Sequence, residues 1–307
     1  MKIAVMGAGG VGGYFGAKLA KAGADVTFIA RGAHLAAMRA GGLRVEGHTE
    51  RFALQPVRAT DDPAEVGAVE LVLLAIKAYD LERATRQMQP LIGPATAILP
   101  LLNGADIAER IGAVVGAEHV LGGVALISAR IAEPGLIRQM GTLNKIVFGE
   151  LSGAVTPRSE AIRDALLHAQ IATELSRQIR SEIWKKFLFI TAAGGVCAVT
   201  GSLLGAVLAD PDTRALYAGC VEEAAAVARA LRIALPESAV ADTLRFSDAV
   251  PKETRTSMLL SLEQGQKLEL DSLNGTVARM GRELGVPTPV NQFIATALKL
   301  RAGGRDA

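Results

Sequence analysis

A short apolar strand that leads directly into closely spaced glycines constrains the fold of this chain more than any other feature. Residues 2–6 (KIAVM) are typical of a buried parallel strand, and residues 11–22 carry apolar side chains at helical spacing. Between them, glycines recur in the GxGxxG pattern, which is typical of a dinucleotide-binding unit whose backbone amides hold a pyrophosphate. The pattern therefore predicts cofactor contacts at Gly7, Ala8, Gly9, Gly10, Val11 and Gly12.

Strands and helices continue to alternate through the first hundred residues. Residues 25–30, 69–76 and 95–102 are short apolar runs that predict buried strands, and residues 80–89 predict a helix between two of them. Because short strands alternate with helices, we expect an α/β Rossmann domain with a mostly parallel sheet.

The pattern changes between residues 120 and 150. Gly141 and the Pro134–Gly135 pair separate short apolar runs, which predicts a meander of three strands at residues 124–131, 136–140 and 145–148. A helix is expected over residues 156–170, with Pro157 in its first turn.

No convincing strand follows residue 179, and prolines punctuate helical stretches from there on. We therefore assign residues 1–178 to the nucleotide-binding Rossmann domain. Residues 179–307 form an all-α domain for substrate binding and dimerisation, so a homodimer is among the expected states.

Residues 187–209 form an uncharged stretch that is long enough to span a bilayer. Gly201 and Gly205 within it have the GxxxG spacing of paired membrane helices. The stretch is rich in Ala, Gly, Thr and Ser rather than Leu and Ile, which favours a buried central helix over a membrane span.

Charge and composition exclude several classes of function. Lys and Arg exceed Asp and Glu by only two, so nothing indicates a nucleic-acid partner. Cys197 and Cys220 are interpreted as small buried hydrophobes, and the four histidines share no metal-ligand spacing. The glycine-broken N-terminus is not a signal peptide, so a cytoplasmic protein is expected.

The end of the second strand indicates which cofactor is bound. NAD sites place a carboxylate there for the ribose hydroxyls, whereas this chain has Ile29, Ala30 and Arg31. A guanidinium can pair with a 2′-phosphate through two hydrogen bonds, so Arg31 favours NADPH.

Further motifs recur in a specific order along nearly the whole chain. They are the GxGxxG turn with Arg31 and the segments Leu74–Asp80, Leu102–Gly104, Glu182–Lys186, Thr256–Met258 and Glu269–Gly275. In this order the chain resembles the ketopantoate reductase (2-dehydropantoate 2-reductase) family. The resemblance implies a Rossmann domain followed by a helical domain, and NADPH-dependent reduction of a small 2-keto acid.

The resemblance also implies the catalytic residues. Lys186 matches the family's general acid, and Glu269 matches the glutamate that binds the substrate hydroxyl and orients the lysine. Independently of the resemblance, Lys186 precedes the uncharged stretch, so partial desolvation should lower its pKa and make it a better proton donor. Lys185 is interpreted as a solvated flank, although the sequence does not fully separate the two lysines.

Three other residues complete the expected site. Lys77 and Asn103 follow predicted strands at the carboxyl edge of the sheet, where open α/β sheets bind ligands. The resemblance implies that Lys77 contacts cofactor and substrate and that Ser257 helps to bind the substrate carboxylate. An amide at Asn103 can hold the nicotinamide or the substrate by hydrogen bonds.

The match fails at three positions where the family commonly has asparagine, which are Ile190, Gly194 and Thr254 here. Fewer amides weaken the binding of a polar hydroxy acid. Two alternatives to ketopantoate reduction therefore stay open: a more apolar 2-keto acid substrate, and a nonenzymatic NADPH-binding regulator.

Overall fold

The computed structural model describes residues 1–48 and 50–305, which form two compact units. The first unit contains Met1–Leu102 and Ile107–Ile179, and the second contains Asn103–Asp106 and the residues from Arg180 on. The short segment Asn103–Asp106 therefore leaves the first unit, in which the strand before it lies, and joins the second.

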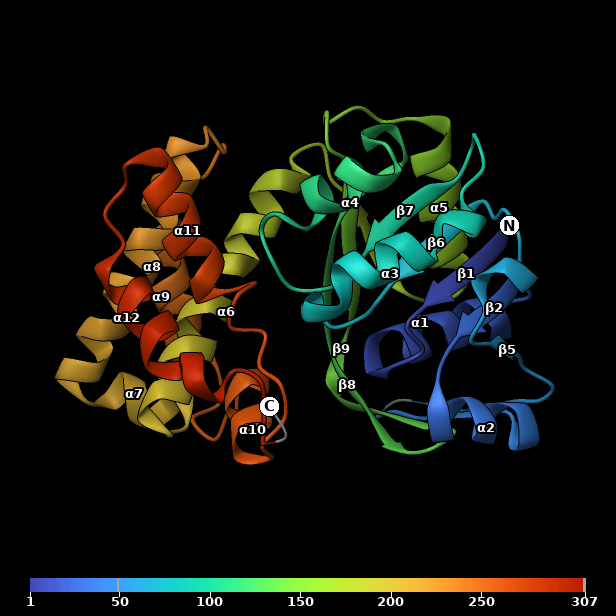
Figure 1. Ribbon diagram of the computed structural model, residues 1–307, viewed down its shortest axis with the longest axis horizontal. Coiled ribbons are helices and arrows are strands. Elements are labelled where there is room, and N and C mark those ends of the chain that lie inside the picture. Colours follow the sequence, from blue (N-terminus) through green and yellow to red (C-terminus); the bar gives the residue numbers. More distant parts are fainter. Residues whose placement is uncertain (49, 306–307) are drawn as a thin grey trace. The chain divides into compact units, whose positions relative to one another are not determined.

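A five-stranded parallel sheet forms the centre of the first unit, which confirms the predicted Rossmann fold (Figure 1). Its strand order is β5 (Arg58–Thr60), β2 (Asp25–Ile29), β1 (Lys2–Met6), β6 (Leu71–Leu74) and β7 (Ala97–Pro100). The chain builds outward from β1 in one direction and then crosses to β6 on the other side. The carboxyl ends of β1 and β6 are thus the switch point at which open α/β sheets bind ligands.

Alternate side chains of β1 enter two different cores. Ile3 and Val5 pack with Phe15 of α1 (Gly10–Lys21), whereas Ala4 and Met6 pack with residues of α3 (Leu81–Gln87) and α4 (Ile107–Val115). Burial on both faces explains why the strand is apolar without a period of two. The sheet is therefore a rigid support for the turn that follows β1.

A second, mixed sheet packs in the same unit. Its order is β10 (Ala172–Leu175), β9 (Leu136–Glu150), β3 (Leu43–Glu46) and β4 (Arg51–Leu54), and β8 (Leu121–Glu133) pairs antiparallel with β9. The predicted three-stranded meander is wrong, because residues 136–140 and 145–148 belong to the single strand β9. Leu126 pairs with Lys145 and Ser128 with Met140, so Gly141 lies where the pairing register shifts within β9 rather than in a turn between two strands.

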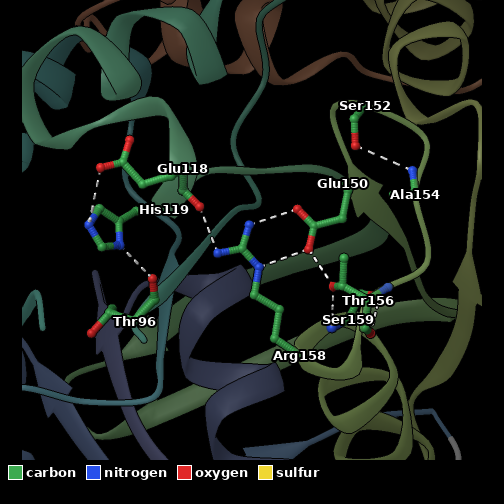
Figure 2. Close-up of polar contacts among 9 residues, drawn as sticks. All are labelled: Thr96, Glu118, His119, Glu150, Ser152, Ala154, Thr156, Arg158 and Ser159. Carbon is green, nitrogen blue, oxygen red and sulfur yellow. Dashed lines mark hydrogen bonds and ion pairs between the residues drawn. The ribbon is translucent and has the colours of Figure 1, made fainter. Parts of the chain in front are cut away.

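A polar cluster joins the end of β9 to α5 (Pro157–His168), as Figure 2 shows. Glu150 accepts hydrogen bonds from Arg158 Nε (2.8 Å), Arg158 Nη2 (2.7 Å) and Thr156 Oγ1 (2.7 Å). Thr156 and Ser159 form a reciprocal capping box at the start of the helix, which confirms the helix predicted there. The hydrogen bonds from Arg158 hold the pKa of Glu150 below its ordinary value.

Seven helices form the second unit, and its described residues contain no strand, as predicted. Their core contains Trp184, Phe187, Tyr217, Val277 and Ile294. The helices are α6 (Ile179–Thr200), α7 (Leu204–Ala209), α8 (Pro211–Ala230), α9 (Ala239–Ala249), α10 (Ser257–Glu263), α11 (Asn274–Leu284) and α12 (Pro289–Leu298).

The uncharged stretch at residues 187–209 is not one continuous helix, contrary to prediction. α6 ends at Thr200, because Gly201 adopts a left-handed conformation (φ +65°), and α7 starts at Leu204. Gly201 and Gly205 therefore do not share a helix face. α6 is long and apolar enough to cross a membrane, but 61% of its apolar window is buried inside the protein, which favours the core-helix interpretation.

Candidate active site

The turn between β1 and α1 has the features of a phosphate cradle. Gly7 adopts φ +99°, and its N–H and that of Ala8 donate to the carbonyl oxygen of Ile29. Gly9 precedes α1 without a side-chain cap, and the first turn carries no acidic residue. The helix N–H groups and their partial positive charge are thus available to an anion.

The glycines of this turn differ in what surrounds them. A Cβ on Gly9 would meet no atom within 4 Å. A Cβ on Gly12 would overlap the carbonyl oxygen of Gly7, and a Cβ on Gly10 would overlap the carbonyl oxygen of Ala129. Gly10 and Gly12 are therefore needed for packing, and Gly9 keeps an open surface. An open glycine before an uncapped helix fits the pyrophosphate of a dinucleotide.

Arg31 lies at the same edge of the sheet. It follows β2 after Ala30 and immediately precedes α2 (Gly32–Gly41), where its side chain is 58% exposed. One guanidinium nitrogen lies 3.6 Å from Asp80 Oδ2, and Arg83 binds the other oxygen of that carboxylate at 2.7 Å. An exposed guanidinium at the end of β2 is able to pair with a phosphate through two hydrogen bonds.

Sequence reasoning missed His34, which adjoins the glycine turn. Its Nδ1 accepts a hydrogen bond from the backbone N–H of Gly135 (3.1 Å), in the β8–β9 hairpin. Burial lowers the pKa of His34, and the nearby backbone of Ala8 opposes this shift. No spacing in the sequence indicated this contact, because Gly135 lies 101 positions away.

Lys77 and Asn103 follow neighbouring strands but fall into different units. Lys77 is exposed and follows β6. The end of β6 lies against the glycine turn, because a Cβ placed on Gly7 would be only 2.6 Å from the carbonyl oxygen of Ala75, two residues before Lys77. Asn103 is half-buried and belongs to the second unit. The segment that contains Asn103 is held in the second unit by the ion pair between Asp106 and Arg279 on α11 (2.6 Å).

Lys186 and Glu269 form an electrostatic pair in the second unit. Lys186 is partly buried on α6, and burial lowers its pKa to about 8, as expected from the sequence, while Glu269 opposes the shift. Glu269 is only 9% exposed, between α10 and α11. Lys185 is instead 41% exposed and bound to Glu182 at 2.8 Å, so the structure separates the two lysines.

Ser257 is the first residue of α10, where it is exposed. It follows Thr256, whose hydroxyl accepts the N–H of Leu259 and caps the helix (3.2 Å). The candidate residues thus form two groups: Gly7–Gly12, Arg31 and Lys77 in the first unit, and Asn103, Lys186, Ser257 and Glu269 in the second.

Two positions that lack the family's asparagines lie in apolar surroundings. Gly194 is buried, and a Cβ there would contact Met258 (3.5 Å) and Leu273 (3.6 Å). Ile190 packs against the core of the same unit. Cys197 and Cys220 are free and buried, which confirms their interpretation as small hydrophobes, and burial raises the pKa of Cys197 to about 12.

Comparison with known proteins decides the family. Residues 3–153 match the family "Ketopantoate reductase PanE/ApbA", and residues 178–302 match its C-terminal counterpart. The chain belongs to the ketopantoate reductase family. A 2-dehydropantoate 2-reductase from Mesorhizobium japonicum is 36% identical to this reductase over 311 residues, which cover 94% of each chain.

Solved structures agree with this reductase in fold. A PanE/ApbA family ketopantoate reductase from Ralstonia eutropha JMP134 has a TM-score of 0.91 at 30% identity and covers 98% of each chain. A 2-dehydropantoate 2-reductase from Geobacter metallireducens GS-15 has a TM-score of 0.90 at 30% identity, over 98% of this chain and 99% of that one. The protein is therefore an oxidoreductase of the 2-dehydropantoate 2-reductase type.

Proposed function

We propose that this reductase uses NADPH to convert 2-dehydropantoate, or a closely related 2-keto acid, into the corresponding 2-hydroxy acid. The observation that carries the proposal is the pair of Lys186 and Glu269. A partly buried ammonium with a pKa of about 8, beside a buried carboxylate, is matched to proton donation near neutral pH.

The first unit supplies the residues that would hold NADPH. The amides of Gly7–Gly12 would bind the pyrophosphate, Arg31 the 2′-phosphate, and Lys77 a further part of the cofactor, with Asn103 contributing from the second unit. When bound, NADPH supplies the hydride that the keto carbon accepts.

Lys186 completes the reaction in this proposal. Its Nζ donates a proton to the former carbonyl oxygen, so the product is a hydroxyl and the lysine becomes a neutral amine. Before that step, the positive charge of Lys186 stabilises the negative charge that develops on the oxygen. Glu269 orients the ammonium and accepts a hydrogen bond from a substrate hydroxyl, while Lys77, Asn103 and Ser257 bind the remaining polar groups of the substrate.

A more apolar 2-keto acid is the second candidate substrate. Two observations favour it: the side-chain position of Gly194 is surrounded by Met258 and Leu273, and Ile190 packs against the apolar core. Both offer carbon atoms at positions where an amide would bind a polar group. In either case we propose a cytoplasmic enzyme that acts on a small molecule and forms a homodimer, which size-exclusion chromatography with light scattering would test.

The experiment is a kinetic comparison of variants. NADPH oxidation is followed with ketopantoate and with branched 2-keto acids of increasing apolar size. We expect Lys186→Ala to reduce kcat by about 10²–10⁴-fold while NADPH binding persists. Lys185→Ala is the matched control and should retain near-normal turnover, because Lys185 is already paired with Glu182.

The cofactor is tested separately. Arg31→Ala should raise the KM and the Kd for NADPH far more than those for NADH, since NADH has no 2′-phosphate. Equal effects on the binding of both cofactors would contradict the proposal that Arg31 binds the 2′-phosphate. NADPH binding without turnover of any keto acid in the panel would favour the regulator over the enzyme.

A further inference from the structure

A buried amide links the catalytic helix to the segment that carries Glu269. Asn274 is the first residue of α11 and is fully buried. Its Nδ2 donates to the carbonyl oxygen of Thr191 on α6 (3.3 Å) and to Oδ1 of Asn291 (3.0 Å), and it lies 3.5 Å from Cys220 Sγ. Because both oxygen partners only accept hydrogen bonds, they must face the NH₂ group of Asn274, which fixes which way round its side-chain amide lies.

The network continues through two further helices. Asn291 on α12 is also fully buried, and its Nδ2 donates to the carbonyl oxygen of Cys220 (3.2 Å) and to Glu223 Oε2 (2.8 Å). The Glu223 carboxylate in turn accepts the backbone N–H groups of Val290 and Asn291. Helices α6, α8, α11 and α12 are thus joined by hydrogen bonds of the Asn274 and Asn291 amide groups, and buried networks of this kind restrict how the helices move relative to one another.

The segment with Glu269 is held at both of its ends. The N–H of Leu268 donates to the carbonyl oxygen of Ala302 (2.9 Å), and the carbonyl oxygen of Leu270 accepts the N–H groups of Leu273 and Gly275. Asn274 directly follows this compact turn. Its side chain therefore connects the turn to α6, five residues beyond Lys186 along that helix.

Gly195 makes the connection sterically possible. A Cβ on Gly195 would lie 2.5 Å from Oδ1 and 2.6 Å from Nδ2 of Asn274, so no larger residue fits beside the amide. Its neighbour Gly194 differs, because a Cβ there would first meet Met258 at an ordinary 3.5 Å. The two adjacent glycines of α6 thus provide a matched pair for mutation.

We propose that Asn274 is a positioning residue, which uses the space left by Gly195 to hold Glu269 at a fixed place relative to Lys186. The proposal deepens the proposed function and rests on the roles given there to Lys186 and Glu269. Asn274 itself transfers no proton. Its contribution is to keep the carboxylate close enough to favour the protonated lysine.

The direct test is the titration of Lys186 in the intact protein, which needs no substrate. Competitive acylation of lysine amines at a series of pH values, read by mass spectrometry, reports the pKa of individual lysines. In Gly195→Ala and in Asn274→Ala the carboxylate is no longer held, so the pKa of Lys186 should fall by about 1 unit. Gly194→Ala should leave it near the wild-type value of about 8.

Other charges do not confuse this readout. Glu269 is the carboxylate that acts on Lys186, Glu182 and Lys185 are bound to each other, and Glu223 is bound to the start of α12. Fluorescence of Trp184, which is buried in the same core, checks that each variant is folded. Asn274→Ala introduces no clash and keeps the test available if Gly195→Ala does not fold.

Enzyme kinetics supply the second readout. In Gly195→Ala and Asn274→Ala, the pH at which reduction declines should move down together with the pKa of Lys186. The double variant should resemble Asn274→Ala alone, because the clash disappears with the side chain. A folded Asn274→Ala protein with an unchanged Lys186 pKa would overturn the positioning role. Full activity of Lys186→Ala would instead overturn the proposed function and leave the titration result standing.

Discussion

At the scale of single residues, burial and one carboxylate act in opposite directions on Lys186. Burial lowers the pKa of its ammonium to about 8, and Glu269 prevents a larger decrease. An ordinary lysine with a pKa of about 10.4 holds its proton too firmly to be an efficient acid at neutral pH. The local sequence predicted this direction, because an uncharged stretch follows Lys186, but it did not indicate which residue would hold Glu269 in place.

The pH dependence of turnover should show this value. In the proposed mechanism reduction needs the protonated amine of Lys186, so we expect kcat to fall as pH rises through about 8, by about tenfold per pH unit above it. Oxidation of the 2-hydroxy acid needs the neutral amine and should rise over the same range. Steady-state kinetics from pH 6 to 10 in both directions would measure this, with Lys185→Ala as control. A decline only near pH 10 would contradict the role of Lys186.

At the scale of elements, the turn between β1 and α1 contains one glycine with an open side-chain position and one whose side-chain position is filled by its neighbours. Gly9 faces open space, whereas Gly12 lies against the carbonyl oxygen of Gly7. The GxGxxG spacing assigned both to one motif. Only the structure shows that a side chain would find free space at Gly9 but would overlap other atoms at Gly12.

Substitution of each glycine by alanine should separate the two roles. Gly9→Ala should fold with nearly unchanged Tm but bind NADPH at least about tenfold more weakly, because the new methyl group occupies the phosphate side of the turn. Gly12→Ala should lower Tm, since strand and helix must move apart. Thermal unfolding and fluorescence titration with NADPH measure both effects. An unstable Gly9→Ala protein would show that this turn is closed rather than open.

Local patterns predicted most elements whose side chains are uniformly buried, and they failed where distant contacts decide the conformation. The apolar runs at β1, β2, β6 and β7 were found. The short strands β3 and β4 were not, because strands of four residues carry too little periodicity to be recognised. Gly141 and Gly201 show why glycine alone is ambiguous: the first lies at a register shift within β9, and the second ends α6. The contact between Asn274 and Thr191 spans 83 positions, beyond any local pattern.

At the scale of the whole molecule, the two units differ in how their carboxylates are held. In the first unit, Arg158 lowers the pKa of the buried Glu150. Arg110 also lowers the pKa of Glu82, but Glu82 is exposed and therefore contributes less. Burial would raise the pKa of Glu50, but Lys18 and Lys21 together outweigh it and lower the value. In the second unit, Asp210 and Asp248 also have lowered pKa values, but both are exposed at the surface, where such interactions contribute less.

The first unit should therefore be the more sensitive to acid. A lowered carboxyl pKa stabilises the folded state above the unfolded value of about 4.3, and this stability is lost as pH falls through the folded value. Urea unfolding at pH 7 and pH 3.5 should show the difference. The only tryptophan, Trp184, reports on the second unit, and far-UV circular dichroism reports on both.

We expect the two probes to separate at pH 3.5, with the tryptophan transition at the higher urea concentration. Arg158→Ala should lower the stability of the first unit at pH 7 by about 1–3 kcal/mol, because the buried carboxylate of Glu150 then loses its charged partner. Arg163→Ala, which removes only ion pairs to exposed Glu160 and Asp164, is the matched control. Coincident transitions at both pH values would contradict this difference between the units.

The long strand β9 also has a consequence for the order in which the protein folds during synthesis. All five strands of the parallel sheet lie within the first hundred residues, so that sheet can assemble while the ribosome is still translating the rest. The β3–β4 hairpin must wait for Leu136 and Ile137 of β9, its parallel neighbour. The segment Asn103–Asp106 must wait longer still, until Arg279 emerges. The nascent chain therefore completes its nucleotide-binding sheet well before Asn103 reaches the unit in which Lys186 and Glu269 lie.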